Sequence, residues 1–97
     1  MVGIDAELAV AEQASGALSR SPANAAMVQP LRKAYITAKR ANSNLSSGLA
    51  LSGARHAVGI TFPDLIRAIE NDQPLGEKVN SAQFAVEIWI EALRAIR

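Results

Sequence analysis

The sequence predicts an all-α fold, a compact bundle of four or five helices with a long C-terminal helix. Apolar residues recur every three or four positions over most of the chain, and no stretch alternates apolar with polar residues as a half-buried strand would. Hydrophobic residues make up 49% of the chain and include many alanines, whereas aromatic residues make up only 4%, which is typical of closely packed helices. A chain of 97 residues fits one domain, residues 1–97, with a single core.

The N-terminal half is expected to hold three helical segments. The first covers residues 4–19 and has acidic residues in its first turns, where they suit the positive end of the helix dipole. Pro30 is expected to interrupt the next segment, because proline lacks an amide hydrogen, so we expect a short helix over 22–28 and a longer one over 30–42. The stripe expected to face the core from the first helix holds Ile4, Leu8, Ala11, Ser15 and Leu18.

The third quarter of the chain gives a weaker pattern and then a clear start signal. Residues 46–58 predict only a weak helix, because glycine inside a helix costs about 1 kcal/mol relative to alanine. A new helix is expected to begin near Thr61, with that residue as its cap, a proline in the first turn and Asp64 three residues after the cap. Residues 71–74, Asn-Asp-Gln-Pro, are expected to end it.

Residues 79–97 predict one uninterrupted helix with more large apolar residues than a single core-facing stripe needs. Val86, Trp89 and Leu93 share the broad apolar side and are expected in the core. Phe84 and Ile88 lie one turn apart on the flank beside the polar side. We therefore expect these two residues to contribute to a surface that binds another protein or a second copy of the chain, the alternative being that a long loop covers them.

A basic stripe is the sharpest polar feature of the sequence. It lies on one side of the 30–42 helix, opposite alanine and leucine, and consists of Arg32, Lys33, Ile36, Lys39 and Arg40. Such a stripe can meet the phosphates of a nucleic acid or an acidic protein surface. It can equally be the solvated outer side of a surface helix.

No arrangement of residues in the sequence indicates catalysis or a cofactor. Cysteine is absent, which excludes disulfides and thiolate chemistry, and His56 is the only histidine. Glu91 is expected to form an ordinary surface ion pair with Arg94. No apolar run is long enough to span a bilayer, so we expect a cytoplasmic protein. Because no catalytic or metal-binding motif is present, we also expect a protein that is not an enzyme and holds neither metal nor cofactor.

These observations predict a small helical protein–protein interaction module that associates with itself, as a homodimer, through or beside its C-terminal helix. The alternative is a nucleic-acid-associated accessory or regulatory protein that uses the basic stripe. The formal net charge of +1 indicates neither an acidic solvating tail nor a strongly basic nucleic-acid binder.

Overall fold

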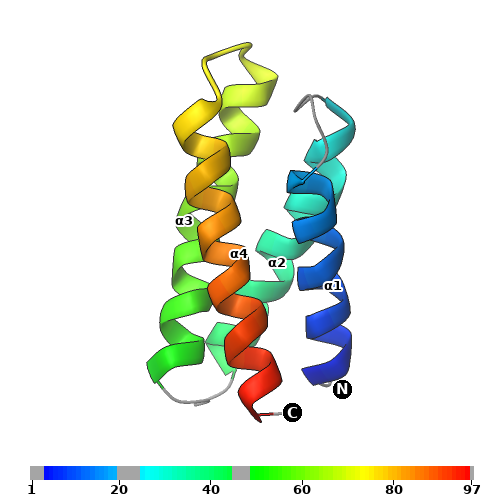
Figure 1. The fold of residues 1–97 in the computed structure, drawn as a ribbon, viewed down its shortest axis with the longest axis vertical. Helices are drawn as coiled ribbons and strands as arrows, with labels where there is room; N and C mark the ends of the chain where they lie inside the picture. The colour runs from blue at the N-terminus through cyan, green and yellow to red at the C-terminus, as the bar shows by residue number, and fades with distance from the viewer. Residues whose placement is uncertain (1–3, 20–24, 45–48, 97) are drawn as a thin grey trace.

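The computed structural model describes residues 4–19, 25–44 and 49–96, which form an antiparallel four-helix bundle. Its elements are α1 (Ile4–Leu18), a 3-10 helix (Ala25–Met27), α2 (Val28–Asn44), α3 (Leu49–Glu70) and α4 (Gly76–Ile96). Successive helices run in opposite directions, and α1 closes the bundle by packing against α4 (Figure 1). The described residues contain no strand, so the predicted all-α fold is confirmed.

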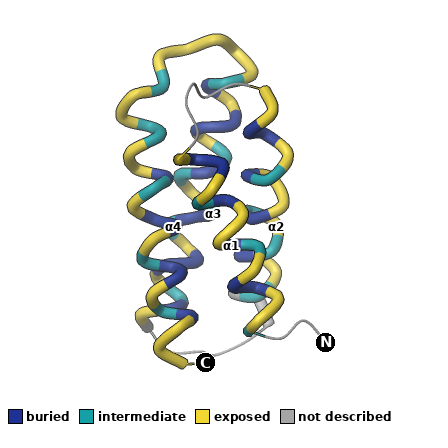
Figure 2. Tube along the Cα trace, turned by 45° about the vertical axis from the view of Figure 1, so that its right-hand side comes forward, coloured by how far each residue is buried: buried dark blue, intermediate teal, exposed yellow. Residues whose placement is uncertain are grey.

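The core combines buried alanines and large apolar residues from all four helices. Fully buried alanines such as Ala11 on α1 and Ala38 on α2 let neighbouring backbones approach closely, and the largest apolar side chains are Phe62 on α3 and Trp89 on α4. Buried stretches lie on the sides of the helices that face one another (Figure 2). The three residues expected in the core from the last helix, Val86, Trp89 and Leu93, are all fully buried.

The stripe predicted to face the core from α1 is partly wrong. Ser15 and Ile4 are only half-buried, whereas Glu7 and Ala14 are buried. The helix is rotated relative to the expectation, because its inward side follows the spacing of Glu7, Ala11, Ala14 and Leu18.

The predicted interruption at Pro30 is also wrong, because α2 begins at Val28 and continues through that residue. Proline is tolerated there because Pro30 lies in the first turn, where backbone amides have no partner within the helix. The helix expected over residues 22–28 lies partly outside the described residues. Its described part is the 3-10 helix Ala25–Met27 and the first residue of α2.

The largest correction concerns Thr61, which does not cap a helix. It lies inside α3, with Pro63 two residues further on, and its Oγ1 donates a hydrogen bond to the carbonyl oxygen of Ala57 at 2.8 Å. The predicted weak helix and the predicted helix from Thr61 are therefore one continuous helix, although residues 46–48 lie outside the described part. A proline inside a helix costs about 3 kcal/mol, whereas each large apolar side chain buried on either side of Pro63, such as Val58 or Leu65, contributes about 1.5–3 kcal/mol.

The end of α3 at Glu70 agrees with the prediction that residues 71–74 end this helix. Asp72 has a φ of 54°, and the amide of Gln73 donates to the carbonyl of Ala68 at 2.9 Å, which closes the helix. Aspartate is one of the few residues that tolerate this left-handed conformation. The chain then turns back at once, so α3 and α4 form a hairpin that lies side by side along its whole length (Figure 1).

Candidate interaction surface

Large apolar side chains are exposed on the hairpin formed by α3 and α4. Phe84 on α4 is 66% exposed, and Ile60 on α3 is 59% exposed. Ile88, one turn after Phe84, is half-buried and packs against the edge of the core. The two residues singled out from the sequence thus differ, because Phe84 is free for contact over most of its surface and Ile88 only over part.

The register of the hairpin brings Ile60 and Phe84 to the same level. An ion pair of 3.0 Å between Lys78 Nζ and Asp64 Oδ2 shows which parts of the two helices lie side by side. Ile60 comes four residues before Asp64 and Phe84 six residues after Lys78, so in an antiparallel pair they lie within about 3 Å of each other along the bundle axis. Both point away from the core, and with Ile88 they form what we term the outer α3–α4 face.

The residues of the basic stripe all lie exposed on α2, as predicted. Two of its cations contact their own chain: Arg32 Nη2 lies 3.3 Å from Glu70 Oε2, and Lys39 Nζ lies 3.5 Å from the Tyr35 hydroxyl and above that ring. Lys33 and Arg40 are also exposed, and Ile36 is 40% exposed between the cations.

The structure does not bring the two sets of predicted partner-binding residues together. The basic stripe is on α2 and Phe84 is on α4, and these helices are diagonal in the bundle, each packed chiefly against α1 and α3. They are therefore separate surfaces.

Sequence reasoning missed a buried polar cluster of Glu7, Arg55 and Trp89. Arg55 Nε donates to Glu7 Oε2 at 2.8 Å and Arg55 Nη2 to Glu7 Oε1 at 2.7 Å, a two-pronged ion pair. Trp89 Nε1 donates to the same Oε2 at 2.7 Å. The side chains of Arg55 and Glu7 are 0% and 4% exposed, so this ion pair lies wholly inside the core.

The cluster joins α1, α3 and α4. Because α1 and α3 are diagonal in the bundle, the ion pair between Glu7 and Arg55 crosses its centre. Every buried side-chain nitrogen and oxygen in the described residues has a hydrogen-bond partner, so the cluster leaves no buried polar atom unsatisfied. It is enclosed and complete, which makes it a structural element rather than a site open to a ligand.

Other polar residues considered in the sequence lie on the surface. His56 is exposed on α3. The expected pair between Glu91 and Arg94 is wrong, because Arg94 Nη2 instead contacts Glu12 Oε2 of α1 at 2.9 Å. That contact joins α4 to α1, which a pattern confined to one helix could not reveal.

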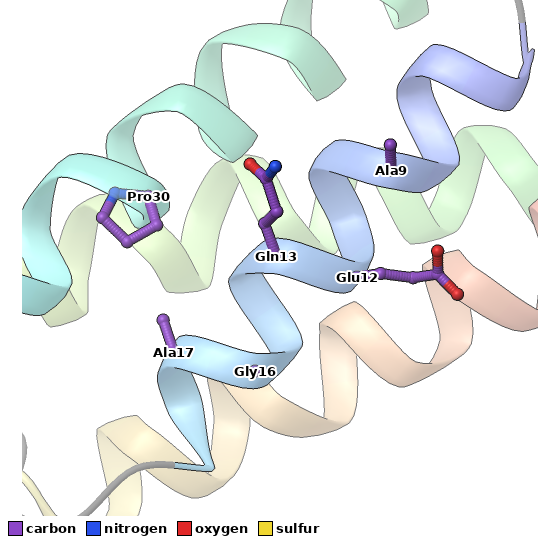
Figure 3. Close-up of a pocket in the computed structure, with 6 residues that line it drawn as sticks. All are labelled: Ala9, Glu12, Gln13, Gly16, Ala17 and Pro30. Carbon is purple, nitrogen blue, oxygen red and sulfur yellow. The ribbon is translucent and has the colours of Figure 1, made fainter.

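An open groove runs between α1 and α2 (Figure 3). Its lining residues are Ala9, Glu12, Gln13, Gly16, Ala17 and Pro30. The only ionisable residue among them, Glu12, is already paired with Arg94. The groove therefore offers small apolar surface and no group suited to acid–base or nucleophilic chemistry.

Among residues 4–19, 25–44 and 49–96, no three histidine or carboxylate side chains gather closely enough to hold a metal ion. Within the same part of the chain, no helix combines the length and the apolar character needed to cross a membrane. Comparison of the sequence with protein-family models, with curated proteins and with solved structures gave no match.

Proposed function

We propose that this protein is a non-enzymatic helical module that binds protein through the outer α3–α4 face, with a second copy of itself among its partners. The observation that carries the proposal is the 66% exposure of Phe84 on a helix that already buries Val86, Trp89 and Leu93. The core of the bundle is complete without Phe84, so the fold gives no reason for a phenylalanine at this position.

Single exposed apolar residues are common on protein surfaces and need no partner. Here Ile60 lies at the level of Phe84 on the neighbouring helix, and Ile88 extends the apolar surface by one turn. Apolar residues grouped at one level of two neighbouring helices favour a binding site over scattered exposure. Burial of a side chain such as Phe84 stabilises a complex by about 1.5–3 kcal/mol.

The test compares two apolar-to-polar changes on different surfaces. Phe84→Ser should weaken association at least about tenfold and leave the melting temperature nearly unchanged, because an exposed side chain contributes little to the fold. Ile36→Ser on α2, which is 40% exposed, is the matched control and should leave association unchanged. Sedimentation equilibrium and thermal melts measure the two effects. Association that withstands Phe84→Ser would refute the proposal.

Ile88→Ser should behave differently from Phe84→Ser. Since Ile88 is half-buried against the core, its replacement should lower both association and thermal stability. Melts of the two single variants separate these effects.

The second candidate function is nucleic-acid binding through the basic stripe. The exposure of Lys33, Arg40 and Ile36 on one side of α2 favours it, whereas the contacts of Arg32 with Glu70 and of Lys39 with Tyr35 count against it. Reversal of Lys33 and Arg40 to glutamate should abolish any such binding without unfolding the protein. Binding to phosphates should also fall steeply with added salt, so salt-insensitive binding would exclude this function.

A further inference from the structure

We propose that the partner at the outer α3–α4 face is a second copy of this chain, related to the first by a twofold axis that runs parallel to the helices. This inference rests on the proposed function, because it names the partner and the geometry of that same face. Its support is the distribution of charge around Ile60 and Phe84.

The charges beside the apolar residues differ in sign between the two helices. On α3, Arg67 follows Ile60 by seven residues, and its side chain is exposed. On α4, Glu77 precedes Phe84 by seven residues and Glu91 follows it by seven, and both are exposed. A spacing of seven residues keeps side chains on one side of a helix.

These charges have no ion-pair partner within the described residues. The neighbouring charges of opposite sign do: Asp64 on α3 pairs with Lys78 on α4, and Glu70 pairs with Arg32. What remains around the outer face is therefore basic on α3 and acidic on α4. Arg67 comes three residues after Asp64 and Glu77 one residue before Lys78, so Arg67 and Glu77 share a level at one end of the face.

Rotation about a twofold axis parallel to the helices leaves the position of each residue along the bundle axis unchanged and exchanges the places of α3 and α4. The α3 of one copy then faces the α4 of the other, so Ile60 contacts Phe84 of the second copy and Arg67 meets Glu77 of the second copy. Each contact occurs twice, as in any isologous dimer.

The other way to place this face against itself is a twofold axis across the helices. That arrangement sets α3 against α3 and α4 against α4 with the levels inverted. Glu77 would then face Glu91 of the second copy. Like charges placed opposite each other disfavour an interface, so the charges select the axis parallel to the helices.

Two charge reversals test this geometry, because each should weaken the dimer when present alone and a mixture of the two variants should restore it. In an Arg67→Glu homodimer, two carboxylates oppose each other in both copies of this contact, and in a Glu77→Lys homodimer two cations do. We expect each variant to dimerise at least about tenfold more weakly than the wild-type chain. In an equimolar mixture both contacts become Glu opposite Lys or Glu opposite Arg, so the heterodimer should regain nearly wild-type affinity.

The experiment uses the full chain, with a mass tag on one variant so that native mass spectrometry distinguishes heterodimer from homodimer. Lys33→Glu on α2 is the matched control, because it changes the net charge as Arg67→Glu does but lies on another surface, and it should leave dimerisation unchanged. Thermal melts check that the variants fold. Glu77→Gln, which removes the contact without reversing the charge, should weaken the dimer less than Glu77→Lys.

Failure of this inference can be distinguished from failure of the proposed function. A dimer that dissociates on Phe84→Ser but shows no recovery in the mixture would overturn the twofold arrangement and leave the binding face in place. A monomeric wild-type chain that binds a different protein through Phe84 would overturn the second copy as partner. A dimer indifferent to Phe84→Ser would overturn both, and preferred heterodimer formation in the mixture would support both.

Discussion

Charged side chains are usually exposed and large apolar side chains usually buried. The buried polar cluster and the outer α3–α4 face are opposite exceptions to this rule. Inside the bundle, Glu7 and Arg55 are charged residues with essentially no exposure to solvent. Outside it, Ile60 and Phe84 are large apolar residues with more than half of their surface exposed. The two regions differ in whether the described residues surround these side chains.

In the polar cluster every requirement is met within one chain. The carboxylate of Glu7 accepts from Arg55 and from Trp89, so the charges lost from water are matched by charge-assisted hydrogen bonds. On the outer face the described residues supply no cover for Phe84. Under the proposed function, stability and binding reside in different parts of this small bundle, and mutations should therefore separate them.

The largest effect is expected from Glu7→Ala. This change leaves the guanidinium of Arg55 buried without its counter-charge, which should cost about 3–5 kcal/mol of unfolding free energy. That is a large part of the roughly 5–15 kcal/mol that holds a domain of this kind together. Urea denaturation followed by circular dichroism measures it, and a loss below about 1 kcal/mol would contradict the burial of the pair.

The matched control replaces both charged residues, as Glu7→Leu with Arg55→Leu. With no charge left to desolvate, this double variant should recover most of the stability lost in Glu7→Ala, although Trp89 Nε1 then lacks its acceptor. A double variant as unstable as the single one would show that packing at these positions, rather than charge, determines the result.

An intermediate effect is expected from Trp89→Phe. The ring remains apolar and aromatic, but the hydrogen bond to Glu7 Oε2 is lost, and a smaller ring leaves some space in the core. Hydrogen bonds to charged groups contribute about 1.5–3 kcal/mol, so a loss of that size is expected in the same denaturation experiment. In the background of Glu7→Leu with Arg55→Leu, the same change should cost distinctly less, because the acceptor is already gone.

The smallest effect on stability is expected on the outer face. Ile60→Ser should change the unfolding free energy by no more than about 0.5 kcal/mol, since the side chain is 59% exposed and makes no contribution to the core. Thermal melts at low protein concentration, which disfavours any association, measure this. A marked destabilisation there would mean that Ile60 supports the bundle, and the contrast between the two regions would disappear.

Much of the fold follows from the periodicity of apolar residues alone. The all-α class and the burial of Val86, Trp89 and Leu93 follow from their spacing, and so does the outward position of Phe84. The boundaries were harder to predict, because they depend on competition between local signals and packing. At Thr61 and Pro63 the local signal indicates a helix start, but burial on both sides of the proline continues the helix.

The polar cluster could not be predicted by treating each helix separately. Charged residues are expected at the surface, and nothing local shows that an acid in one helix meets a base 48 positions later. A signal was nevertheless present. Glu7 lies in step with Ala11, Ala14 and Leu18, and Arg55 lies in step with core residues of α3. The core-facing residues of α3 in this register are Leu51, Val58, Phe62 and Leu65. One acid and one base, each at a core position, indicate an ion pair inside the bundle.

The ion pair across the bundle also constrains how this sequence can change over generations. A single replacement of Glu7 or of Arg55 leaves an isolated charge in the interior, whereas the joint replacement by apolar residues costs little. The intermediate sequences are therefore the unstable ones, and the two positions are energetically coupled. In any set of descendants of this chain, positions 7 and 55 should thus be exchanged together, as a charged pair or as an apolar pair.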